Sequence, residues 1–321
     1  MSKKRILKTL AVMAVMLSLA AAPAMAQSEL DQSQYAFNAE WVMQEPAKQT
    51  FTAQKTGTLD KVAIVVGCDD SFIREPPFCG SIIDGFPLTV EIKGTQSDPP
   101  PQKFVVRGLD WYDVPLDPAP FVEAGKQYEI RLSIVDDEFY YRTQVAWLGG
   151  ATFDNYSGGD FYYWNGTDWS LPTDSTTGDF HDIMFETYVT PDTTAPEVDV
   201  VNPPEDPAQG TAGAARGTNV TATFSERMDP DTLSTSTFKL FKVNKNGATS
   251  RITNAPVRLS ADGLTARLNP FGSSDTLLNK STKYKAVVTT GAEDLAGNAL
   301  DQGPTTTGNQ QKVWYFTTGT S

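Results

Sequence analysis

The segment Thr190-Pro-Asp-Thr-Thr-Ala-Pro196 divides the chain and decides how the rest of it can fold. Its two prolines and its small polar residues cannot pack a hydrophobic core, and they favour an extended, semi-rigid spacer. The sequence before it is rich in aromatic residues and holds both cysteines, whereas the sequence after it is rich in Thr, Ala and Asn. We therefore predict two separate domains joined by a linker at residues 191–195.

The first 26 residues have the pattern of a secretory signal peptide. Basic residues at positions 3, 4, 5 and 8 precede an apolar run, Leu10–Ala22, that is too short to span a bilayer comfortably. Ala24-Met-Ala26 is a typical cleavage site, which predicts a secreted protein that begins at Gln27. We expect residues 27–34 to form a disordered lead. Since no later apolar stretch is long enough for a membrane span, we expect no membrane insertion after cleavage.

The chain is acidic. Its formal net charge is −13, and cleavage would remove four basic and no acidic residues to leave −17. An acidic surface repels nucleic acid and anionic lipid, so neither is an expected partner. Carboxylates can also hold a structural Ca²⁺, for which Asp136, Asp137 and Glu138 are the candidate ligands. A solvated turn is the alternative interpretation of these three residues.

Cys68 and Cys79 are the only cysteines in the chain. Export and an even number of cysteines favour one disulfide between them, which would stabilise the fold by about 2–3 kcal/mol. Two cysteines and the single histidine, His181, supply too few ligands for a typical zinc site.

The hydrophobic pattern predicts an all-β chain. Val62–Val66 is continuously apolar, as in a strand covered on both faces, whereas Leu88–Ile92 and Tyr128–Ile134 alternate between apolar and polar residues. No long stretch has helical periodicity. Many short strands separated by Gly, Pro, Asp and Asn predict two β-sandwich domains, at residues 35–190 and 196–321.

Residues 35–190 resemble the jelly-roll, carbohydrate-binding-like modules of secreted bacterial proteins. The resemblance rests on short pieces such as Gln49-Thr-Phe-Thr-Ala53, Tyr156-Ser-Gly-Gly-Asp160 and Asp182-Ile-Met-Phe-Glu-Thr-Tyr-Val189. It implies a jelly-roll-like β-sandwich and a function in binding polysaccharide or a cell-surface polymer.

The second domain has a more specific set of motifs. Asp192-Thr-Thr-Ala-Pro196, Asn219-Val-Thr-Ala-Thr-Phe-Ser-Glu226, Asp294-Leu-Ala-Gly-Asn298 and Trp314-Tyr-Phe-Thr-Thr318 follow one another in an order that resembles the bacterial immunoglobulin-like domain of surface-layer proteins. The resemblance implies a seven-stranded sandwich that serves as a spacer or adhesive unit at the cell surface. In physical terms, Asp294 can cap local backbone amides while Gly297 and Asn298 permit a tight turn.

Aromatic residues supply the candidate ligand-binding site of the first domain. Flat rings can stack on sugar faces, which makes the following residues candidates: Trp111, Tyr140, Tyr141, Tyr162, Trp164 and Trp169. Strand alternation places Phe161 and Tyr163 on one face of their strand and Tyr162 and Trp164 on the other. The alternative is that these rings fill the core of the sandwich.

The sequence contains no recognisable catalytic motif. His181 is the only histidine, no Gly-x-Ser-x-Gly elbow is present, and acidic pairs are too common to identify a glycosidase. We therefore expect a secreted, non-enzymatic surface protein that binds a glycan through its first domain. The alternatives are a purely structural or adhesive protein–protein interaction unit, and a polysaccharide hydrolase.

Overall fold

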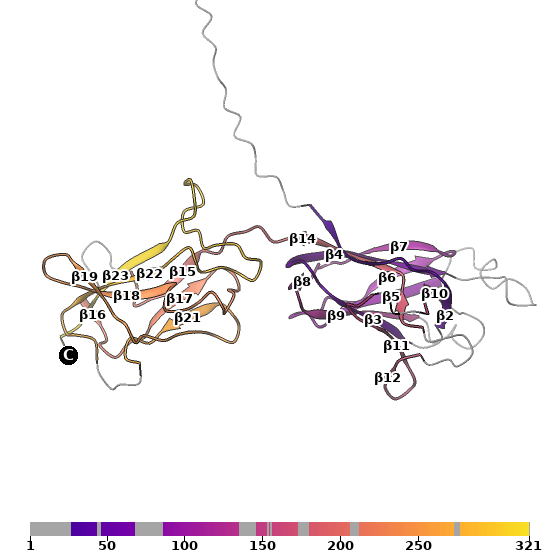
Figure 1. Ribbon diagram of the computed structural model, residues 1–321, viewed down its shortest axis with the longest axis horizontal. Coiled ribbons are helices and arrows are strands. Elements are labelled where there is room, and N and C mark those ends of the chain that lie inside the picture. Colours follow the sequence, from indigo (N-terminus) through magenta and orange to yellow (C-terminus); the bar gives the residue numbers. More distant parts are fainter. Residues whose placement is uncertain are drawn as a thin grey trace, which may run out of the picture.

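The computed structural model describes residues 27–43, 46–67, 86–134, 146–152, 154, 156–172, 180–205, 212–272 and 277–320. These residues form two β-sandwiches that follow one another along the chain (Figure 1). All the regular elements of the described residues are strands, so the predicted all-β fold of two sandwiches is confirmed. Within the same residues, no helix has the length and apolar character needed to cross a membrane.

The N-terminal sandwich consists of an eight-stranded and a six-stranded sheet. The larger sheet has the order β1 (Glu29–Gln34), β14 (Phe185–Pro191), β4 (Gly57–Gly67), β10 (Ala146–Ala151) and β13 (Asp182–Ile183). Attached to it are β2 (Ala39–Met43) on β10 and both β7 (Asp110–Pro115) and β8 (Phe121–Val122) on β4. The smaller sheet has the order β12 (Trp169–Ser170), β11 (Phe161–Trp164), β3 (Ala47–Thr52), β9 (Gln127–Ile134), β5 (Phe86–Lys93) and β6 (Gln102–Val106).

One hydrophobic core fills the space between these two sheets. It contains the inward-facing residues of the alternating strands, such as Val90 on β5 and Ile130 on β9. All five residues of Val62–Val66 are buried, which confirms that β4 is covered on both faces. Such packing requires a fixed pairing register, because a shift of one residue would turn the inward-facing side chains of a strand to the other face of the sheet.

The structure corrects the prediction of a disordered lead at residues 27–34. Glu29–Gln34 forms strand β1, which pairs with β14 at the edge of the eight-stranded sheet. The side chains of Asp31, Gln32 and Gln34 are buried although they are polar. Asp31 accepts hydrogen bonds from the backbone amides of Gln54 (3.1 Å) and Lys55 (2.8 Å), so its burial is compensated by distant parts of the chain.

The C-terminal sandwich consists of a four-stranded and a five-stranded sheet. The first has the order β15 (Val198–Asn202), β17 (Val220–Phe224), β21 (Thr265–Leu268) and β20 (Val257–Leu259). The second has the order β16 (Ala212–Ala214), β23 (Lys312–Thr318), β22 (Lys283–Val288), β18 (Phe238–Val243) and β19 (Thr249–Arg251). The described part of the domain thus has nine strands, whereas the resemblance implies seven. Three of the nine, β16, β19 and β20, are only three residues long.

The turn at Asp294–Asn298 forms as the sequence predicts. Asp294 is buried, and its Oδ1 atom accepts hydrogen bonds from the backbone amides of Ala296 (2.7 Å) and Asn298 (2.8 Å). Gly297 has a φ angle of 86°, a region that glycine enters without steric cost. Trp314 is fully buried in the core of this domain together with Phe238 and Phe316.

The two sandwiches touch each other at the linker. Asp192 donates its backbone N–H to the carbonyl of Thr56 (3.1 Å) in the N-terminal domain and accepts a hydrogen bond at its own carbonyl from Asn298 (3.2 Å) in the C-terminal domain. Thr56 also donates its hydroxyl to the carbonyl of Leu295 (3.2 Å). Arg227 forms an ion pair with Glu123 across the same junction. These direct contacts limit how freely the linker segment can bend.

Candidate functional site

The outer face of the six-stranded sheet carries the largest group of predicted ligand-binding residues. Tyr162 on β11, Lys48 on β3 and Arg131 on β9 are consecutive cross-strand neighbours in register. The neighbouring row, formed by Phe161, Gln49 and Ile130, is fully buried. Because side chains alternate along a strand, the row that contains Tyr162 points away from the core. Phe161 and Tyr162 therefore lie on opposite faces of β11, as strand alternation predicts, and the structure places Phe161 toward the core.

A short turn brings the two candidate tryptophans together. Asn165 accepts hydrogen bonds at Oδ1 from the backbone amides of Thr167 and Asp168, both at 2.9 Å, and donates from Nδ2 to Ser170 (2.6 Å). Gly166 has a φ angle of 93°, which a residue with a side chain adopts only with strain. The turn pairs Trp169 on β12 with Trp164 on β11, and their ring centroids lie 5.6 Å apart in an edge-to-face arrangement.

Two cations lie over the rings of Tyr162 and Trp169. The ammonium group of Lys48 lies 4.9 Å from the ring centroid of Tyr162 and 5.0 Å from that of Trp169. The guanidinium group of Arg131 lies 5.4 Å from the Trp169 ring. Glu129 accepts hydrogen bonds from Lys48 (2.7 Å) and from Arg131 (2.6 Å), which fixes both cations above the sheet. We call the six residues Lys48, Glu129, Arg131, Tyr162, Trp164 and Trp169 the Trp164 face.

The ionisation of the Trp164 face follows from its contacts. Burial would raise the pKa of Glu129, but hydrogen bonds from Lys48 and Arg131 outweigh burial and lower that pKa below its ordinary value. Burial, followed by the charge of Asp160, raises the pKa of Tyr162. At neutral pH, Glu129 is thus an ionised acceptor, Lys48 and Arg131 are donors, and Tyr162 keeps its phenolic proton. Half-buried rings beside fixed donors and acceptors are suited to binding a flat, polyhydroxylated ligand.

The other predicted ligand residues do not join this face. Trp111 lies on β7 in the eight-stranded sheet, on the opposite side of the sandwich. Tyr140 and Tyr141 lie outside the described residues, as do the proposed calcium ligands Asp136, Asp137 and Glu138 and the proposed disulfide partners Cys68 and Cys79.

Sequence reasoning missed the charged half of the Trp164 face. Glu129 and Arg131 occupy the polar positions of an alternating strand, so the sequence shows that they point outward. It does not show that β3 and β11 bring Lys48 and Trp169 beside them, because that depends on pairing between strands far apart in the chain. The polar residues of each alternating strand could have pointed to this site, but only if the order of the strands in the sheet had been known.

A cluster of acidic side chains lies at the domain junction. Carboxylate oxygens of Asp192, Glu226 and Asp294 lie within 4.8 Å of one another. Burial, together with the charges of Asp192 and Asp294, raises the pKa of Glu226 to about 8. Repulsion among three carboxylates can be relieved by a shared proton or by a bound cation. These three residues are therefore the group that could hold a metal ion among the described part of the chain.

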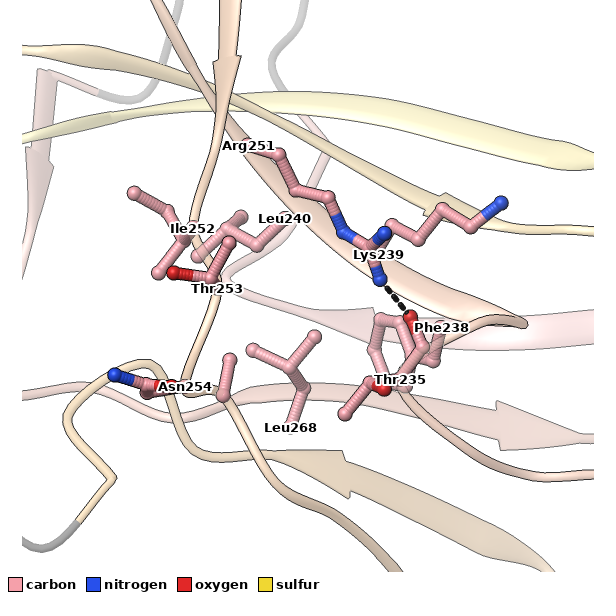
Figure 2. Close-up of a pocket in the computed structure, with 10 residues that line it drawn as sticks. Thr235, Phe238, Lys239, Leu240, Arg251, Ile252, Thr253, Asn254 and Leu268 are labelled. Carbon is pink, nitrogen blue, oxygen red and sulfur yellow. Dashed lines mark hydrogen bonds between the residues drawn. The ribbon is translucent and has the colours of Figure 1, made fainter.

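The described residues also line two cavities. One, of about 320 Å³, opens in the C-terminal domain between β18, β19 and β21, where Arg251 donates a hydrogen bond to the carbonyl of Thr235 (Figure 2). The other, of about 550 Å³, lies in the N-terminal domain beside β1 and β3. Its Tyr156 donates a hydrogen bond to Gln32 (2.9 Å), which fastens β1 to the sandwich. Of the predicted ligand residues that the structure describes, Trp111, Tyr162, Trp164 and Trp169, none lines either cavity.

Comparison with known proteins relates the C-terminal part of the chain to other proteins. No curated protein matches the chain. Among solved structures, the N-terminal part of the bacterial S-layer protein SbsC is 20% identical, with 39% of this chain and 24% of that chain covered and a TM-score of 0.27. Domains 1–6 of surface layer protein SbsC are 20% identical, with 40% and 14% covered and a TM-score of 0.27. This chain thus spans a quarter or less of these proteins.

The sequence profile of a protein family identifies the second domain directly. It matches residues 192–318, which include the linker residue Asp192, the turn at Asp294–Asn298 and every strand from β15 to β23. The C-terminal domain of this chain is therefore a bacterial Ig-like domain.

Proposed function

We propose that this chain is a secreted, non-catalytic surface protein whose N-terminal sandwich binds a glycan on the Trp164 face. The observation that supports this most strongly is the Trp164–Trp169 pair, held at 5.6 Å beside Lys48 and Arg131 on an outward sheet face. Aromatic rings stack on the apolar faces of sugars, and the ionised groups around them can bond the hydroxyls.

The negative charge of the chain makes an anionic ligand unfavourable. The formal net charge is −13, so a strongly anionic polymer would be repelled over long range. The two cations of the Trp164 face are already paired with Glu129, which leaves little positive charge to attract an anion. A neutral polysaccharide or cell-wall glycan is therefore the proposed partner.

The bacterial Ig-like domain serves as the spacer in this proposal. Its described residues have a continuous hydrophobic core and direct contacts to the first domain at Thr56 and Glu123. A domain held in this way would set the distance and the direction of the glycan-binding face relative to the surface from which it projects. The proposed location at the cell surface also rests on the signal peptide predicted from the sequence.

Affinity electrophoresis of the full chain without its predicted signal peptide tests the proposal. The gels would contain xylan or hydroxyethyl cellulose, and retardation would be compared between the wild type, Trp164→Ala and Trp169→Ala. We expect each substitution to weaken binding about tenfold or more, since a central aromatic contact is worth upwards of about 1.4 kcal/mol. Tyr315→Ala is a matched control, because Tyr315 is also an exposed aromatic with a lysine, Lys283, 4.8 Å from its ring.

The outcome separates the proposed function from its alternatives. Retardation that equals that of the wild type in both tryptophan variants would contradict a site on the Trp164 face. A wild-type protein that is retarded in none of the gels would favour the structural or adhesive alternative. Release of reducing sugar from the polymers would favour the hydrolase.

A further inference from the structure

A second aromatic group lies on the outer face of the eight-stranded sheet. Tyr35 follows β1, Trp111 belongs to β7, and their ring centroids lie 6.0 Å apart in an edge-to-face arrangement. The two residues are 52% and 37% exposed. Large aromatic rings that gather on one exposed face are uncommon on soluble proteins and usually mark a binding surface.

Polar groups beside this pair are held in fixed positions. The hydroxyl groups of Tyr35 and Tyr188 donate hydrogen bonds to the two carboxylate oxygens of Glu186, each at 2.6 Å. The ammonium group of Lys61 lies 4.1 Å from the ring centroid of Tyr188 and 2.9 Å from a carboxylate oxygen of Asp113. We call Tyr35, Lys61, Trp111, Asp113, Glu186 and Tyr188 the Trp111 face.

The strand register explains how these residues come to share one face. Glu186 on β14 pairs with Ala63 on β4, and Ala63 pairs with Asp113 on β7. Two residues further along β4, Val65 pairs with Trp111. Ala63 and Val65 are buried although they lie outside the core between the sheets, so larger side chains cover them on the outer face.

The two faces of the sandwich have the same chemical composition. Each has an edge-to-face aromatic pair, a carboxylate that accepts two hydrogen bonds from neighbouring side chains, and a lysine placed over an aromatic ring. Neither face presents an unpaired cation among these residues, so both suit a neutral glycan better than an anionic one. The same ligand chemistry therefore fits both.

We propose that the Trp111 face is a second glycan-binding surface and that the N-terminal domain is bivalent. In its ligand class this inference rests on the function proposed for the Trp164 face. The hydrophobic core separates the two sheets, and in Figure 1 β7 and β12 lie on opposite sides of the domain. One short stretch of polymer cannot reach both faces, so a bivalent domain cross-links two polysaccharide chains or two distant parts of one chain.

The test uses the full chain without its predicted signal peptide, in the wild-type form and as Trp111→Ala, Trp169→Ala and the double variant. Retardation in gels that contain xylan or hydroxyethyl cellulose measures binding, and light scattering from solutions of the same polymers measures cross-linking. We expect each single variant to remain retarded but to lose cross-linking, and the double variant to lose both. Tyr35→Phe keeps the ring and removes one bond to Glu186, and Tyr315→Ala controls for the loss of an exposed aromatic elsewhere.

Each alternative result has one meaning. If Trp111→Ala binds and cross-links as the wild type does while Trp169→Ala abolishes binding, the second surface is wrong and the Trp164 face stands. If Trp169→Ala behaves as the wild type and Trp111→Ala abolishes binding, the Trp111 face stands and the function proposed for the Trp164 face is wrong. If the wild type is retarded by neither polymer, both are overturned. Circular dichroism of every variant distinguishes lost binding from lost folding.

Discussion

Asp182 shows how much a single buried residue can depend on its protonation state. Its side chain is fully buried, and its Oδ1 atom accepts a hydrogen bond from Gln49 (2.9 Å). The other oxygen has no hydrogen-bond partner within the described residues. Burial raises the pKa of Asp182 to about 6, even though the bond from Gln49 acts in the opposite direction.

The contribution of Asp182 to the stability of the N-terminal domain should therefore fall as pH rises through this range. The folded state keeps the proton of Asp182 up to about pH 6, whereas the unfolded chain loses it near pH 4, so this contribution is largest below pH 4 and declines until about pH 6. We expect Asp182→Asn to remove about 2–3 kcal/mol of that decline. Urea unfolding measures it through tryptophan fluorescence, because five of the six tryptophans precede the linker.

An exposed carboxylate supplies the control for this prediction. Asp199→Asn changes the same functional group at an exposed position on β15 and should leave the pH dependence unchanged. If Asp182→Asn and the wild type lose stability equally between about pH 4 and about pH 7, Asp182 does not carry its proton in the folded state.

At the scale of elements, the β11–β12 hairpin should control binding more than stability. Its turn is exposed, and the side chain of Asn165 makes three hydrogen bonds within it. We expect Asn165→Ala to loosen Trp169 and to weaken glycan binding by about tenfold, with a loss of only about 1 kcal/mol in stability. Affinity electrophoresis and thermal unfolding of the same samples check the two quantities.

The neighbouring Thr167→Ala is the matched control for the hairpin. Thr167 contributes its backbone N–H to the turn, and the substitution preserves that group. A similar loss of binding in both variants would mean that the turn is not what positions Trp169.

The elements also show where sequence patterns succeed and where they fail. The strands predicted from Leu88–Ile92 and Tyr128–Ile134 lie within β5 and β9, because both sequences alternate between apolar and polar residues. Strand β1 was missed because its sequence is polar, and its buried Asp31 and Gln32 side chains accept hydrogen bonds from Thr187 and Tyr156, more than a hundred positions away. For the same reason, only the aromatic residues of the Trp164 face were predicted. Local alternation identifies these rings, whereas the positions of Lys48 and Arg131 beside them depend on the order of the strands in the sheet.

At the scale of the whole molecule, the protonation state of Glu226 should affect the contact between the linker and the C-terminal domain. Glu226 lies with Asp192 of the linker and Asp294 of the Ig-like domain, and the next residue, Arg227, forms the ion pair with Glu123 of the first domain. The sequence motifs contain Asp192, Glu226 and Asp294 separately, but only the fold brings these three residues to one junction. A negative charge on Glu226 would repel both Asp192 and Asp294 and would oppose the contacts that hold the domains together.

The junction should consequently lose stability as pH rises toward 9. Burial and the two neighbouring carboxylates raise the pKa of Glu226 to about 8, so the folded state keeps a proton that the unfolded chain releases near pH 4.5, and the stabilisation is lost from there up to about pH 8. We expect calorimetry to show a loss of roughly 2–4 kcal/mol between about pH 5 and about pH 9, allowing for solvent screening, that Glu226→Gln abolishes. Glu293→Gln, a half-buried neighbour of Asp294, should leave it intact. An equal loss in the wild type and in Glu226→Gln would show that this carboxylate does not govern the junction.

Repeating the scan with excess CaCl₂ tests whether a cation can replace the proton, since a cation would keep the wild type stable at high pH.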